Sequence, residues 1–178
     1  MLNHSSLVIE FRFQFSTQYQ CGSYLMPEKI PDDDDVSRHL FSPSMGNTGG
    51  DLVWGNVFMF KTDNQFRESI VWRKYARTLA DVHGLGCQKQ TNDRAAGKKI
   101  TYFGALTGNV GRIRAIRSKT GARFQVLHVP DEGIHHAEIS YIQDRPLSKN
   151  DKAELKRGIK EEFRDRSEHS CPDVVVAN

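Results

Sequence analysis

The predicted fold rests on the stretch from Lys98 to Ile142, which reads KKITYFGALTGNVGRIRAIRSKTGARFQVLHVPDEGIHHAEISYI. β-branched and aromatic residues recur in four short runs, and glycine-containing turns separate these runs at regular spacing. Glycine suits such turns because a positive φ costs it little. We therefore predict strands over residues 99–106, 111–117, 122–129 and 134–142. Consecutive strands joined by short turns are typical of an antiparallel β-meander.

The flanking segments predict the rest of the sheet and two helices. Residues 7–15 alternate apolar and polar side chains, which indicates a strand with one buried face. Residues 52–60 are apolar on both faces and predict a buried central strand. Apolar steps of three and four predict helices over about 63–83 and 148–165. The expected fold is α+β, with a meander of four to six strands, two helices packed on one face and a basic face left open.

The chain of 178 residues is expected to form one folded domain between two flanking segments. Residues 1–50 are interpreted as an N-terminal strand followed by a mostly irregular acidic segment. Residues 51–166 are interpreted as the single α+β domain. Residues 167–178 are interpreted as a flexible tail.

Composition indicates a cytoplasmic protein without a membrane span. Apolar residues make up 38% of the chain, and no apolar run approaches the roughly 18 residues that a spanning helix needs. The three cysteines, Cys21, Cys87 and Cys171, are odd in number and far apart, so we expect reduced thiols rather than a disulfide framework. No nucleotide fingerprint or metal-ligand spacing is present, and no cofactor is expected.

Charge is distributed unevenly along the chain. Residues 1–51 carry three cations against seven carboxylates, a net charge of −4, whereas residues 85–125 carry nine cations against one carboxylate, a net charge of +8. Such asymmetry indicates either a polyanionic partner or mutual screening of the two segments.

The basic segment predicts a surface that binds phosphate groups. In a strand over 111–117, Arg112 and Arg114 share one face, and the guanidinium fork matches phosphate geometry. The predicted nucleic-acid-binding residues are Lys98, Lys99, Arg112, Arg114, Arg117, Lys119 and Arg123. RNA is favoured over DNA as the partner. The alternatives are an acidic protein partner and a charged face that only keeps the sheet soluble.

The last hairpin predicts a histidine pair whose members depend on loop parity. An even loop places His128 and His135 on one face, whereas an odd loop places His128 with His136 and Glu138. Two histidines can cleave RNA without a metal, because one accepts the 2′-hydroxyl proton and the other protonates the leaving oxygen. A cation then stabilises the charged intermediate. The predicted catalytic residues are His128, His135, Arg114 and Arg123.

Two other chemistries are disfavoured. Adjacent strand residues face opposite ways, so His135 and His136 cannot both bind one metal ion in a strand. A nucleophilic Cys87 beside His83 would need a third, orienting group across a flexible Gly-Leu-Gly segment. The first hypothesis is therefore a nucleic-acid-binding protein that, if an enzyme, is a metal-independent endoribonuclease. The second is a non-catalytic module that engages an acidic protein.

Overall fold

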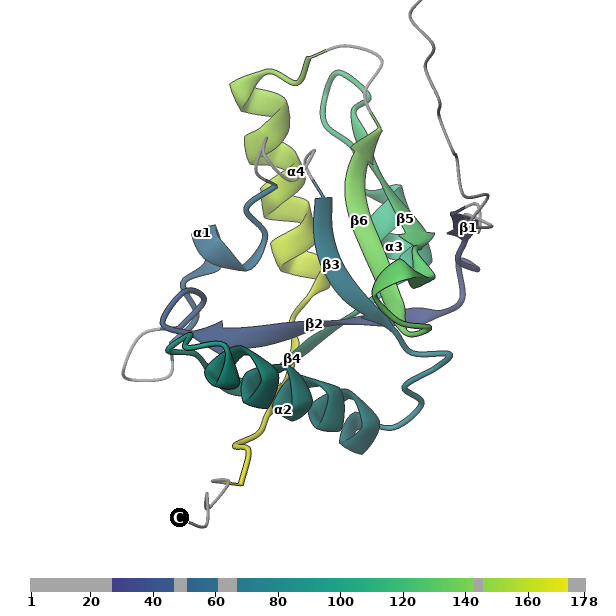
Figure 1. Cartoon of the computed structure of the whole chain (residues 1–178). Helices are drawn as coiled ribbons and strands as arrows, with labels where there is room; N and C mark the ends of the chain where they lie inside the picture. The colour runs from purple at the N-terminus through teal and green to yellow at the C-terminus, as the bar shows by residue number, and fades with distance from the viewer. Residues whose placement is uncertain (1–26, 47–50, 61–66, 143–145, 173–178) are drawn as a thin grey trace, which may run out of the picture.

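The structure of the chain is a computed structural model that describes residues 27–46, 51–60, 67–142 and 146–172 (Figure 1). The strand predicted over 7–15 lies outside the described residues. The elements in chain order are β1 (Glu28–Lys29), β2 (Asp35–Ser42), α1 (Trp54–Val57), β3 (Arg67–Trp72), α2 (Leu79–Ala95), β4 (Thr101–Asn109), α3 (Val110–Ala115), β5 (Arg123–His128), η1 (Pro130–Glu132), β6 (His136–Ile142), α4 (Lys149–Glu162) and β7 (Asp165–Glu168).

The strands form one antiparallel sheet in the order β1-β5-β6-β3-β2-β4-β7. This confirms the α+β class, although the described part of the chain has seven strands and four α-helices rather than four to six and two. The meander is wrong. Within the stretch that predicted it, only β5 and β6 are neighbours, while β4 pairs with β2 and β7.

The meander fails because its second segment is the helix α3 rather than a strand. Asn109 caps this helix, since its side-chain oxygen accepts a hydrogen bond from the Arg112 amide at 3.1 Å. The Gly111 amide donates to the Asp32 carbonyl at 2.9 Å, so the acidic segment satisfies a second free amide of the first turn. Ile113 is fully buried and anchors the helix.

Two further predictions are corrected, and one is confirmed. The helix predicted over 63–83 is wrong, because β-branched and aromatic residues form β3 there and a Thr78–Asp81 capping box starts α2 only afterwards. The strand predicted over 52–60 contains the short helix α1 instead. Residues 1–50 are predicted to be mostly irregular, yet they contain β2. Its pairing with β4 is the longest strand pairing among the described residues. The helix over 148–165 is confirmed as α4.

The helices cover opposite faces of the sheet rather than one. Adjacent β4 residues Ala105 and Leu106 point into separate apolar clusters. The larger cluster includes Leu155, Ile159 and Phe163 from the α4 side. The smaller cluster, next to α2, consists of Val71, Ala76, Val82 and Ala105 with partly buried Leu85. In Figure 1, α2 lies below β2 and β4, whereas α4 lies above them, to the left of β3.

The sheet opens between β2 and β3. The two strands pair only at Val36–Trp72 and Ser37–Val71, and Figure 1 shows β3 rising away from β2. Arg38 fills the gap: Nη2 lies 2.6 Å from a carboxylate oxygen of Glu68, and Nη1 donates to the carbonyl oxygen of Ser69. One edge of β3 is thereby held by a side chain rather than by a strand.

Candidate active site

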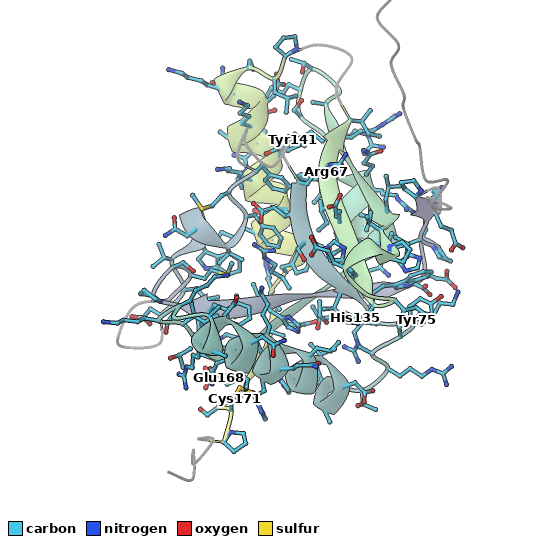
Figure 2. All side chains as sticks on the ribbon, in the orientation of Figure 1. Arg67, Tyr75, His135, Tyr141, Glu168 and Cys171 are labelled. Carbon is cyan, nitrogen blue, oxygen red and sulfur yellow. A yellow bond between two sulfur atoms is a disulfide. The ribbon has the colours of Figure 1, made fainter. Side chains whose placement is uncertain are left out.

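The structure separates the two histidines that were predicted to pair. His128 ends β5 and pairs with Ala137, not with His135. The His128 ring is buried 4.9 Å from the Trp72 ring centroid, and its Nε2 lies 2.8 Å from the Ile134 carbonyl oxygen. His135 precedes β6 and lines a cleft whose lining does not include His128 (Figure 2).

The hairpin has the even parity, which places His136 and Glu138 on the face opposite His128. The chain has already left strand geometry at His135, because η1 and Gly133, with φ of 127°, turn it before β6 begins. The predicted cross-strand pairing of His128 and His135 therefore does not form.

Neither arginine of the predicted catalytic set lines the cleft with His135. Arg114 lies on α3, where it donates to the Asp32 carboxylate and, at 2.7 Å, to the Val126 carbonyl oxygen. Arg123 lies at the opposite end of β5 from the hairpin. The structure thus does not bring the four predicted catalytic residues together.

Most of the predicted nucleic-acid-binding cations pair with carboxylates of the chain itself. These ion pairs are Lys98–Asp93 at 2.7 Å, Arg112–Glu162 at 3.0 Å, Lys119–Glu154 at 4.0 Å, and Arg114–Asp32. For Lys99, Arg117 and Arg123, the described residues offer no carboxylate within ion-pair distance. Only Asp32 comes from the acidic segment, because Asp93 lies within the basic segment and Glu154 and Glu162 lie on α4. These pairs leave fewer cations for an external phosphate.

A polar cleft of 410 Å³ lies between α2 and the β3–β6 pair. The wall formed by α2 presents residues at helical steps of three and four: Leu85, Gln88, Lys89, Asn92 and Asp93. The opposite wall is formed by His39, Ser69, Ile70, Val71, Glu132, His135 and His136. The cleft thus collects three histidines, a serine and several groups that can donate or accept hydrogen bonds.

Ser69 and His136 form a hydrogen-bonded pair at the floor of this cleft. The alternation of β3 buries Glu68 and Ile70 and leaves Ser69 exposed on the cleft side. His136 lies opposite Val71 in the sheet, so its ring reaches Ser69 diagonally, with Nε2 3.0 Å from Oγ. An exposed hydroxyl therefore rests against a buried imidazole.

The second nitrogen of His136 fixes the tautomer. Nδ1 lies 2.8 Å from the Val129 carbonyl oxygen, which can only accept, so Nδ1 carries the proton. In the neutral ring Nε2 then has the free lone pair and accepts the Ser69 hydroxyl proton. A nucleophile, a base and an orienting group in this order are the arrangement that activates serine. A Glu132 carboxylate oxygen, 3.5 Å from Nε2, can stabilise the ring when it is protonated.

His135 and His39 complete the cleft as neutral imidazoles. The His135 ring makes no hydrogen bond within the described part of the chain, and burial, together with the charge of nearby His136, lowers its pKa. His39 donates from Nε2 to the Val82 carbonyl oxygen at 2.9 Å, and burial lowers its pKa to about 4. His135 is therefore free to exchange a proton with a bound molecule.

Sequence reasoning missed Ser69 because that residue was assigned to a helix. The signal that identifies the strand is the run Ile70-Val71-Trp72, whose β-branched and aromatic residues favour a pleated, half-buried surface. Once β3 is a strand, residue parity places Ser69 on the face opposite Ile70. The pairing with His136 still depends on sheet order, which joins segments 67 residues apart.

One sequence expectation about cysteine is corrected. Cys87 and Cys171 are joined by a disulfide, so they are not reduced thiols. The disulfide also leaves Cys87 without a free thiol for the nucleophilic chemistry that the sequence disfavours, and the His83 ring nitrogens lie 2.8 Å from the Tyr102 and Ser167 hydroxyls.

Neither a family model nor a curated protein nor a solved structure matches this chain. Within the described ranges, no cluster of three or more histidine, cysteine or acidic side chains is arranged to hold a metal ion. In that same part of the chain, no helix has the length and apolar character needed to cross a membrane. Function is therefore inferred from the geometry of the cleft.

Proposed function

We propose that the protein is a hydrolase whose nucleophile is Ser69 and whose general base is His136. A single observation carries this proposal: an accessible serine hydroxyl lies 3.0 Å from a buried imidazole whose other nitrogen is held by the Val129 carbonyl. The proposal depends on the connected contacts from the Ser69 hydroxyl to the His136 ring and from that ring to the Val129 carbonyl, rather than on any one of these groups.

The reaction is an acyl or phosphoryl transfer to serine followed by hydrolysis. Ser69 Oγ attacks the carbonyl carbon or phosphorus of an ester while His136 Nε2 accepts the hydroxyl proton. The leaving alcohol takes this proton from His136, which returns to its neutral form. Water then attacks the seryl ester, His136 accepts the water proton and passes it to Ser69 Oγ, and the serine hydroxyl is regenerated. Gln88 and Asn92 supply amide donors on the facing wall for the developing oxyanion.

RNA is a second candidate substrate because His135 and Lys89 lie in the same cleft. There the 2′-hydroxyl of RNA would replace Ser69 as the nucleophile, and a histidine would remove its proton. This version keeps the histidine chemistry predicted from the sequence but moves it away from His128, Arg114 and Arg123. The alternative is that the protein binds an acidic protein without catalysis, and absence of activity in the purified protein would support it.

The test is hydrolysis by the purified chain, in the presence of a chelator, of p-nitrophenyl butyrate, bis(p-nitrophenyl) phosphate and single-stranded RNA. We expect ester turnover that Ser69→Ala removes and Ser140→Ala preserves. Ser140 is a matched control because it lies on the same face of β6 as His136 but bonds Gln125 instead. RNA cleavage that survives Ser69→Ala and disappears in His135→Ala would select the second candidate. Inactivity toward all three substrates would contradict both.

A further inference from the structure

The helix that forms one wall of the cleft has little apolar anchoring. The inward-facing side of α2 consists of Val82, His83, Gly86 and Gln90. Of these four residues only Val82 is a sizeable apolar side chain, and the cluster that it joins is small. Burial of apolar area supplies most packing energy, so a helix of 17 residues with so narrow an apolar contact needs other attachments.

Polar contacts attach α2 to β4 and β7. His83 Nδ1 lies 2.8 Å from the Tyr102 hydroxyl, and the Gln90 side-chain oxygen accepts from the Tyr102 amide at 2.6 Å. His83 Nε2 lies 2.8 Å from Ser167 Oγ on β7, and the His83 ring stacks on His169 with centroids 4.4 Å apart. α2 is therefore held partly by a strand at the edge of the sheet.

That edge strand is itself weakly held. β7 reads Asp-Arg-Ser-Glu, pairs with β4 over four residues and buries no large apolar side chain. Its close approach requires Gly104, where a Cβ would lie 2.3 Å from the Ser167 carbonyl oxygen and where φ is +146°. A strand of this composition gains little from burial and relies on its backbone ladder.

The Cys87–Cys171 disulfide closes this arrangement covalently. It joins the middle of α2 to the segment just after β7, across 84 residues of sequence. Figure 2 shows Cys171 beside α2, beyond Glu168 at the end of β7. Both cysteines are partly exposed, so a dithiol can reach the bond.

We infer that this disulfide is a redox switch that sets the position of α2 and thereby the shape of the catalytic cleft. The inference rests on the proposed function for its effect on catalysis. Reduction by a dithiol transfers two electrons and two protons: a thiolate attacks one sulfur, and the second thiol resolves the mixed disulfide. Cys87 and Cys171 become thiols and the reductant becomes a disulfide. α2 and β7 then retain only their non-covalent contacts, and the wall that carries Gln88, Lys89 and Asn92 loosens.

The test compares oxidised and dithiothreitol-treated protein in a Cys21→Ser background, with hydrogen exchange and p-nitrophenyl butyrate hydrolysis as the two readouts. We expect reduction to raise amide exchange more in α2 and β7 than in α4, and to lower turnover about tenfold through misplacement of the cleft wall. Cys171→Ser should reproduce the reduced state and no longer respond to dithiothreitol.

The exchange measurement separates failure of the switch from failure of the proposed function. If neither form hydrolyses the ester, the proposed function fails and exchange alone decides whether the disulfide holds α2. Unchanged exchange in α2 and β7, once alkylation shows both thiols to be free, would overturn the inference. Alkylation of both cysteines without any reductant would overturn it as well.

Discussion

Arg38 and Glu68 form an ion pair inside the gap between β2 and β3, with side chains only 10% and 9% exposed. Burial lowers the pKa of Arg38, and the Glu68 carboxylate opposes that shift. Glu68 also accepts a hydrogen bond from the Phe60 amide at 2.6 Å. The pair thus replaces part of the missing strand pairing, and we expect its loss to lower the free energy of unfolding.

We predict that Arg38→Met lowers the free energy of unfolding by about 3 kcal/mol or more, because it leaves the Glu68 carboxylate buried without its partner. The double variant Arg38→Met/Glu68→Gln should lose less, since glutamine is uncharged and still accepts from the Phe60 amide. Urea denaturation of the single and double variants measures both effects. A single variant within 1 kcal/mol of the wild type would contradict the assignment.

His39 predicts a pH dependence of stability. Its pKa is about 4 in the folded chain against an ordinary value of 6.5. Between these values the unfolded state binds a proton that the folded state does not, so the contribution of His39 to stability falls as the pH drops from 6.5 to 4 and is constant outside that window. The loss is at most about 3 kcal/mol. Urea denaturation at pH 7 and pH 4.5 should show a smaller difference in His39→Gln, and an equal difference would refute this prediction.

The candidate site could be predicted from the sequence only in part. The pattern identified the last hairpin but left its loop parity open, and the structure has the even parity, which separates His136 from His128. It could not identify Ser69, because a cleft between β3, β6 and α2 depends on a sheet order in which distant segments become neighbours. Nor could it show that Asp32 and Glu162 neutralise Arg114 and Arg112, because side-chain pairing is set by tertiary contacts.

Two glycines of α2 provide a matched pair at the scale of one element. A Cβ at Gly86 would lie 2.5 Å from the Tyr102 ring, whereas a Cβ at Gly84 would meet no atom within 4 Å. We predict that Gly84→Ala stabilises the chain by up to about 1 kcal/mol through helix propensity. Gly86→Ala should instead destabilise it, because α2 is pushed from β4. Thermal denaturation checks both, and equal effects would show that α2 does not pack closely on Tyr102.

Helices and strands could be predicted from the sequence where no tertiary contact overrode the local sequence pattern. The Ser148–Asp151 capping box and the apolar stripe of α4 were sufficient for that helix. Arginine and apolar residues alternate over residues 112–115 as in a strand, yet the segment folds as α3 because Asn109 and the Asp32 carbonyl satisfy its first amides. Capping by a segment almost 80 residues away cannot be read from local periodicity.

At the scale of the whole molecule, the sheet joins the acidic segment, the basic segment and the chain's C-terminal strand into one unit. β2, from the acidic segment, lies between β3 and β4, and the disulfide ties the last described segment to α2. This strand order is the reason that the consecutive β-rich runs predict a meander that does not form. When strands that are distant in sequence pair, the periodicity of the sequence does not indicate which strands are neighbours in the sheet.

The disulfide should contribute measurably to global stability. For a loop of about 84 residues, the loss of chain entropy in the unfolded state predicts a stabilisation of about 4.5 kcal/mol. We therefore expect the urea midpoint to fall on reduction, with the same change in Cys171→Ser. The Cys21→Ser protein is the control and should respond to reductant as the wild type does. A midpoint unchanged by reductant would contradict this prediction.

The activation of Ser69 by His136 is tested most directly by reaction with a fluorophosphonate, which labels serine hydroxyls activated by a neighbouring base, followed by peptide mapping. We predict one adduct, on Ser69, that forms in the presence of a chelator, is absent in Ser69→Ala and is retained in Ser140→Ala. Labelling should slow by about a hundredfold or more in His136→Ala. An unlabelled protein, or an adduct whose rate does not change in His136→Ala, would contradict the account.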